Sequence, residues 1–179
     1  KDAERDNVMG YRVLLAKNNQ GYKYLMKIVS EGYRHGFYYK PRIDKNVLRQ
    51  YHEGLIALSA CLAGEIPHRL LNGDYEGTKK EALEMQDIFG EGNFYLELQE
   101  QGLEEEARIL PDMKRLHADT GIPFVATNYS HYVRQDNAVA QDTLMCIQME
   151  TTVDEETRMR FSNDTFSPHS DDAMRKTFP

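Results

Sequence analysis

The chain has 179 residues, 40% of them hydrophobic, which is enough to bury one core but hardly two full domains. No apolar run approaches the roughly 18 residues that a membrane-spanning helix needs, and the charged start does not form a signal segment, so we expect a cytoplasmic protein without a membrane partner. The net charge of −7 argues against a large basic surface that binds nucleic acid, because phosphate-binding surfaces need clustered lysine and arginine.

The first half of the chain predicts strands alternating with helices. A buried strand is expected over residues 13–16, followed by a helix over 22–33 that Gly36 stops. A short helix follows up to Tyr51, with Asp44 as its N-cap. Residues 55–59 form the second clear apolar run and predict another buried strand.

Between these elements lies a loop that is dense in aromatic and basic side chains. Within it, Tyr39, Lys40 and Arg42 are candidate nucleic-acid contacts, since rings can stack on bases and cations can meet phosphates. The alternative is that the rings cover the end of a helix. The loop is too short for its composition to decide between the two.

The second half continues the alternation of strands and helices. We expect helices at 75–89, 104–120 and 136–149, strands at 94–99 and 124–126, a weak strand at 159–161 and an amphipathic segment after Ser170. Pro111 is a place where the second of these helices can break or restart. Strands separated by helices indicate an α/β fold, with a parallel sheet flanked by helices or a piece of a barrel.

The two cysteines are too few for a disulfide framework, and we expect both to be reduced. Cys146 falls inside a predicted helix and is expected to be core. Cys61 follows a buried strand, where it is either a small buried residue or a metal ligand. Asn128 and His131 follow the strand at 124–126, either as part of a site or as groups that close a loop. If the strands are parallel, Cys61, Asn128 and His131 should lie at one edge of the sheet.

Five sequence runs together resemble the PHP (polymerase and histidinol phosphatase) domain of bacterial replicative DNA polymerase III alpha subunits. They are VLLAKN from Val13, GFYYKPRID from Gly36, EGLIALSACLAGEIP from Glu53, FYLELQ from Phe94 and VATN from Val125. The resemblance implies a distorted β/α barrel. It divides the chain into a partial PHP domain at 1–166 and the start of a connecting segment at 167–179.

The same resemblance implies a metal cluster at the C-terminal edge of the barrel, with Cys61 and His131 as ligands. Tyr11 and Tyr129 stand where family members commonly have a histidine and an aspartate, so these two metal positions are degenerate. A phenol is neutral at pH 7 and a weak ligand. We therefore expect weak binding of Zn²⁺ or Mn²⁺ at a degenerate site.

For function, the resemblance implies a parent protein that is a DNA-directed DNA polymerase, a nucleotidyltransferase of DNA replication that uses Mg²⁺. The chain itself would be a PHP-domain scaffold that lacks the polymerase palm and is inactive alone. Its expected partners are the rest of the alpha chain, proofreading or other replisome subunits, and DNA through the parent. Because the family's opening strands are not found before Tyr11, the strand at 13–16 should need cover from other chain segments.

Two alternatives differ in kind from a scaffold. One is a metal-dependent 3′–5′ exonuclease or phosphoesterase that acts in proofreading, in which clustered metal ions activate water. The other is an unrelated small α/β protein, which the ordered series of matching runs disfavours. The number of converging metal ligands discriminates between scaffold and hydrolase.

Overall fold

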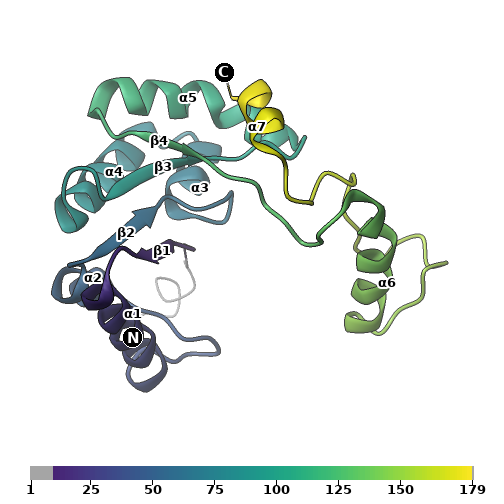
Figure 1. The fold of residues 1–179 in the computed structure, drawn as a ribbon, viewed down its shortest axis with the longest axis horizontal. Helices are drawn as coiled ribbons and strands as arrows, with labels where there is room; N and C mark the ends of the chain where they lie inside the picture. Colours follow the sequence, from purple (N-terminus) through teal and green to yellow (C-terminus); the bar gives the residue numbers. More distant parts are fainter. Residues whose placement is uncertain (1–9, 179) are drawn as a thin grey trace. The chain divides into compact units, whose positions relative to one another are not determined.

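The computed structural model describes residues 10–178 and confirms the α/β class (Figure 1). Its strands are β1 (Val13–Ala16), β2 (Leu55–Leu58), β3 (Phe94–Leu98) and β4 (Phe124–Ala126). Its helices are α1 (Asn19–Arg34), α2 (Lys45–Tyr51), α3 (Glu65–Leu71), α4 (Tyr75–Phe89), α5 (Glu104–Thr120), the short 3₁₀ helix η2 (Gln135–Asn137), α6 (Ala138–Gln148) and α7 (Asp171–Thr177).

The four strands form one sheet in the order β1-β2-β3-β4. Strands β2 and β3 are parallel, as predicted, but β1 and β2 are antiparallel, so the expectation of a parallel sheet is wrong for β1. Two helices connect β1 to β2, and the chain therefore enters β2 at the end where β1 finishes. A hydrogen bond of 2.8 Å from Lys17 N–H to the Gly54 carbonyl joins these two ends.

Strand β1 has the predicted bounds but is not buried. Val13 is 37% and Leu15 49% exposed, whereas Leu14 packs against the core. Among the residues that the structure describes, the strand lies at one end of the sheet order and has a strand neighbour on one side only. Because side chains alternate along a strand, Arg12 is on the same side as Leu14.

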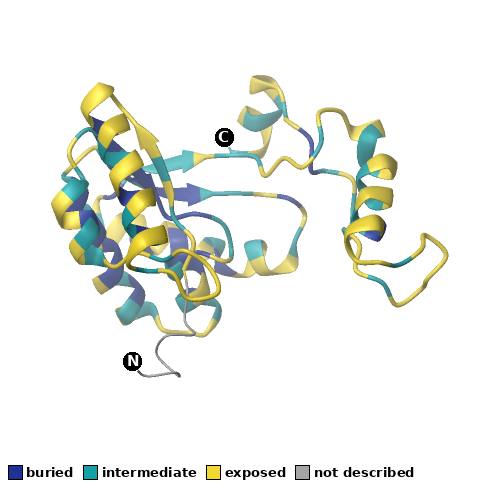
Figure 2. Ribbon diagram, turned by 90° about the horizontal axis from the view of Figure 1, so that it is seen from below, coloured by how far each residue is buried: buried dark blue, intermediate teal, exposed yellow. Residues whose placement is uncertain are grey.

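The described chain divides into two compact units. Unit 1 runs up to Leu98 and adds Arg108–Val125, and unit 2 is Gln99–Ala107 together with the chain from Ala126 onward. The main hydrophobic core belongs to unit 1. Buried side chains of β2 and β3 meet those of α3, α4 and α5 there, including Leu55, Ile66, Met85, Phe94, Leu96 and Leu116. Figure 2 colours the buried parts of the ribbon dark blue.

The helix predictions are largely confirmed. Asp44 caps α2 through a 3.0 Å hydrogen bond from the Val47 N–H, and α5 is continuous through Pro111. Cys146 is buried in α6, as expected. Helix α3 was not predicted from the sequence. It is short, and Pro67 in its first turn resembles a loop signal although proline is tolerated at that place in a helix.

The weak strand expected at 159–161 does not form. That segment is irregular and is held by side chains instead of a strand ladder. The Arg158 guanidinium bonds both carboxylate oxygens of Asp142, and the Phe161 ring stacks on Phe166 with centroids 4.4 Å apart. Among the helices of residues 10–178, none is long and apolar enough to cross a membrane.

Candidate functional site

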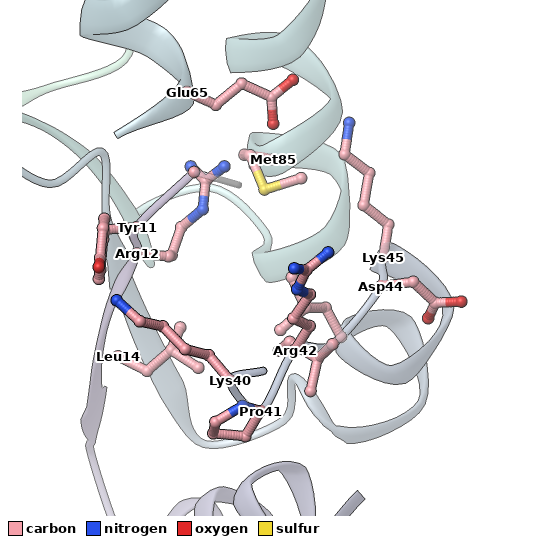
Figure 3. Close-up of a pocket in the computed structure, with 13 residues that line it drawn as sticks. Tyr11, Arg12, Leu14, Lys40, Pro41, Arg42, Asp44, Lys45, Glu65 and Met85 are labelled. Atoms are coloured by element: carbon pink, nitrogen blue, oxygen red, sulfur yellow. The ribbon is translucent and has the colours of Figure 1, made fainter. Parts of the chain in front are cut away.

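Unit 1 contains a cavity of about 500 Å³ between β1, the loop at 36–44 and helices α2, α3 and α4 (Figure 3). We call it the basic pocket. Its lining includes four cations and two carboxylates, which are Arg12, Lys40, Arg42, Lys45, Asp44 and Glu65. Figure 3 shows the cationic head groups approaching the cavity from different sides and different elements.

Arg12, just before β1, is the most deeply placed of these cations. Its Nη2 donates to Oε1 of Glu81 at 3.1 Å, and its guanidinium lies 5.9 Å from the centre of the Phe94 ring. Burial lowers the pKa of Arg12, and the carboxylates of Glu81 and Glu65 only partly oppose this. Its Nη1 is buried and has no hydrogen-bond partner in the part of the chain that the structure describes.

A chain of ion pairs continues from Glu81 along the side of the pocket. Lys45 binds Glu81 and also donates to Glu84 at 2.8 Å, and Arg49 donates to the other oxygen of Glu84 at 2.7 Å. The hydrogen bonds from Lys45 and Arg49 lower the pKa of Glu84 to about 2. Together with the Arg12–Glu81 pair, they join the residue before β1 to α2 and α4, which are far apart in the sequence.

The aromatic and basic loop forms another side of the pocket. The Tyr38 N–H donates to the Lys40 carbonyl at 3.1 Å, and the Arg42 guanidinium lies 5.0 Å from the centre of the Tyr38 ring. Lys40 and Arg42 line the pocket, and Figure 3 shows the Lys40 side chain extending toward Tyr11. Tyr39 is 84% exposed and is not part of the lining. The structure thus gathers two of the three candidate contacts at one cavity.

Of the predicted metal positions, Tyr11 and Cys61 lie on neighbouring segments of unit 1. The Tyr11 N–H donates to the Ala63 carbonyl at 3.0 Å, and Tyr11 and Gly64 form a bridge just beyond Cys61. Cys61 is half-buried, whereas Tyr11 is 56% exposed and lines the basic pocket.

The other two predicted positions, Tyr129 and His131, lie in unit 2 within a cluster of aromatic rings. The His131 ring is 4.6 Å from the Tyr129 ring, edge to face, and 4.8 Å from the Phe161 ring, between centroids. The His131 N–H donates to the Phe166 carbonyl at 2.9 Å. Asn128 Oδ1 accepts a 2.8 Å hydrogen bond from the His169 N–H, so Asn128 ties two loops together.

A tightly bound metal ion needs several converging ligands. Residues 10–178 contain no group of three His, Cys, Asp or Glu side chains that could hold one. His131 is surrounded by carbon-rich rings, which supply no anionic ligand to complete a coordination shell. Within each unit the described side chains supply no complete ligand set for a tightly held metal ion, and the pairing of Cys61 with His131 stays a prediction.

Sequence reasoning missed Arg12, Lys45 and Glu81. A signal for Arg12 was available, because strand alternation places it on the core-facing side of β1 with Leu14. A charged residue on that side needs a partner, and Glu81 on α4 supplies it from 69 residues away. Nothing in the local pattern around Glu81 indicates this role, because the pattern predicts a solvent-exposed residue on the polar face of an amphipathic helix.

The class of protein follows from comparison with known families. The PHP domain family matches residues 3–101, which is more than half of the chain. The chain therefore belongs to the PHP domain family. This agrees with the α/β architecture, in which helices flank a mostly parallel sheet as in part of a PHP-type barrel.

Curated relatives narrow the comparison further. The chain is 41% identical over 167 residues to the DNA polymerase III subunit alpha of Treponema pallidum, with 93% of this chain and 14% of that protein aligned. It is 40% identical over 166 residues to the subunits of the same name from Borreliella burgdorferi and Thermus aquaticus, with the same shares aligned. The chain thus spans about one seventh of the length of these relatives.

Proposed function

We propose that this chain serves as the PHP-domain part of a bacterial replicative DNA polymerase III alpha subunit, as a scaffold and partner-binding platform. The observation that carries the proposal is the alignment of 93% of the chain with a 14% share of alpha subunits. Nucleotide transfer with Mg²⁺ would then take place in parts of such a subunit other than this share. Within the chain, the proposed PHP domain ends at residue 166, and the connecting segment begins at residue 167.

In this role the chain acts in the cytoplasm and in DNA replication, and contacts the rest of an alpha chain, proofreading or other replisome subunits, and DNA through its parent. The exposed side of β1, with Val13 and Leu15, supports a covered position in a larger protein. Tyr39, Lys40 and Arg42 are the proposed nucleic-acid contacts. Cys61, His131, Tyr11 and Tyr129 stay the proposed degenerate metal positions, with weak binding of Zn²⁺ or Mn²⁺.

A first prediction concerns metal binding at Tyr129. We expect Tyr129→Asp to strengthen Zn²⁺ or Mn²⁺ binding by the purified chain about tenfold or more, because it replaces a neutral phenol with an anionic ligand. Titration calorimetry of the wild-type chain, Tyr129→Asp and Tyr129→Phe measures this. Tyr129→Phe is the matched control, since it removes the hydroxyl without adding a carboxylate.

The scaffold role itself is tested by hydrolysis. We expect no metal-dependent release of nucleotides from a single-stranded primer by the wild-type chain. Clear release that His131→Ala abolishes would contradict the scaffold role and support the exonuclease or phosphoesterase alternative. Unchanged metal affinity in Tyr129→Asp would show that the ligand assignment is wrong while leaving the scaffold role standing.

A further inference from the structure

The basic pocket carries positive charge that its own carboxylates do not neutralise. The ion-pair chain along its side contains the three cations Arg12, Lys45 and Arg49, which share the two carboxylates Glu81 and Glu84. This leaves an excess of one positive charge in the chain of pairs. Lys40 adds to it, because its ammonium has no ion-pair partner within residues 10–178.

The two carboxylates of the pocket lining also have hydrogen-bond partners outside the cavity. Asp44 accepts the 3.0 Å cap hydrogen bond from the Val47 N–H, and Glu65 accepts hydrogen bonds of 3.0 and 3.2 Å from the Arg69 guanidinium. The Val47 N–H is neutral, so Asp44 keeps its negative charge, and Glu65 also acts on Arg12 and Lys45 through space. The four cations of the lining still outnumber these two carboxylates. An anionic ligand would meet mainly lysine and arginine there.

Arg12 supplies a second and independent sign that the pocket suits an anion. Its Nη1 is a buried donor without an acceptor in the described residues, although nearly all buried polar groups in proteins have a partner. Burial also lowers its pKa, which means that the charge is less stabilised here than in water. A ligand oxygen near this guanidinium would remove both deficits.

The size and the remaining lining favour a ligand larger than a bare anion. The cavity volume of about 500 Å³ is within the usual range of small-molecule sites, about 300 to 1,000 Å³. Apolar side chains of Leu14, Leu48 and Met85 line it as well, and the half-exposed Tyr11 ring stands beside it (Figure 3). Rings of this kind stack on nucleobases.

We propose that the basic pocket binds the phosphate group of a nucleotide, with Lys40 donating to the phosphate, Arg12 supplying charge from the floor and Tyr11 contacting the base. Neither a metal ion nor the polymerase role is needed for this binding. The inference rests on the proposed nucleic-acid contacts Lys40 and Arg42 and deepens them, and it is argued from the geometry of unit 1. The scaffold role is tested separately by hydrolysis of a primer, so its failure and the failure of this inference are distinguishable. The phosphate can belong to a free mononucleotide or to a single strand.

The experiment measures binding of deoxyadenosine monophosphate and of a single-stranded oligonucleotide to the purified 179-residue chain by titration calorimetry. We expect Lys40→Gln to weaken binding about tenfold, as for loss of one charge-assisted hydrogen bond. Lys23→Gln removes an exposed lysine of α1 outside the pocket and is the matched control. Arg12→Lys should also weaken binding, because it keeps a charge beside Glu81 but removes the guanidinium.

The pattern across ligands and variants decides the proposal. Weaker binding of either ligand to Lys40→Gln, with Lys23→Gln unchanged, supports it, and the ligand that binds more tightly identifies the source of the phosphate. Absence of binding by both ligands, or equal loss in Lys40→Gln and Lys23→Gln, would overturn it. Lys40 is exposed and its replacement should not affect folding, so the test holds even if Arg12→Lys is unstable.

Discussion

At the scale of single residues, Glu81 is only 4% exposed at its side chain and accepts hydrogen bonds from both Arg12 and Lys45. A buried carboxylate is tolerated in a folded protein only when it is paired and hydrogen-bonded. Glu81 thereby fixes the guanidinium of Arg12 at the floor of the basic pocket. Its neighbour in the ion-pair chain, Glu84, is more exposed, and its lowered pKa makes part of the stability of the chain depend on pH.

We predict that the stability of the chain falls in acid partly through Glu84. Its pKa is lowered to about 2 in the folded protein from an ordinary value of 4.5, chiefly by the hydrogen bond from Lys45 and then by that from Arg49. The contribution is therefore present above pH 4.5 and is lost as the pH falls toward 2. Because Glu84 is partly exposed, we expect only roughly 1 kcal/mol from it.

Urea unfolding of the wild-type chain and Glu84→Gln at several pH values between 7 and 2 measures this contribution. Glu84→Gln should be less stable than wild type at pH 7 and equally stable near pH 2. Glu91→Gln, which removes an exposed carboxylate with no recorded partner in the described residues, should keep the wild-type pH profile. A constant difference between Glu84→Gln and wild type at all pH values would refute the assignment.

At the scale of elements, the loop at 36–44 is held in place by close backbone packing. A Cβ at Gly36 would lie 1.8 Å from the Arg42 carbonyl oxygen, which is a backbone atom that cannot move aside cheaply. Tyr39 at the tip of the loop has a φ of 59°, in the left-handed region that favours glycine. The loop that presents Lys40 and Arg42 is thus a tightly constrained turn.

We predict that Gly36→Ala lowers the free energy of unfolding by about 1 to 3 kcal/mol, because the loop must move away from the new methyl group. Gly32→Ala is the matched control. Its Cβ would meet the same Arg42 carbonyl oxygen at 3.4 Å, an ordinary contact, and alanine favours the helix by about 0.5 to 1 kcal/mol. Urea unfolding of the two variants compares them, and equal stability would contradict the steric account.

At the scale of the whole molecule, the described chain leaves much apolar surface exposed. Besides Val13 and Leu15 on β1, the outer face of α1 exposes Tyr22, Met26, Val29 and Tyr33. An exposed edge strand of a sheet pairs readily with other chains, and large apolar patches mark contact surfaces. This arrangement is expected for a piece that other segments of a longer protein cover.

We predict that the purified chain self-associates through β1 and that Leu15→Lys reduces the association, because a charge on an edge strand opposes pairing. Sedimentation velocity over a range of concentrations measures it. Val29→Lys places the same charge on exposed α1 and is the control for a general effect of charge. The prediction would be wrong if the wild-type chain stayed monomeric and its melting temperature did not rise when it was joined to the preceding segment of an alpha subunit.

The sequence by itself determined the elements whose signals are local. Helix α4 and the short helix α2 begin at capping aspartates, and their apolar spacing is readable within a few residues. The order and spacing of the matching runs likewise determined the PHP family, because each run is contiguous in the chain. A helical turn and its cap involve residues three or four apart, so no distant contact is needed to predict them.

Only the tertiary structure decided the direction of β1, its exposure and the composition of the basic pocket. The antiparallel pairing of β1 depends on the path of the chain through α1 and α2, which no local pattern records. The pairing of Arg12 with Glu81 joins residues 69 apart, and that of Lys45 with Glu81 joins residues 36 apart. Such contacts depend on how separate elements pack, and burial then fixes which charges are paired and which donor is left without an acceptor.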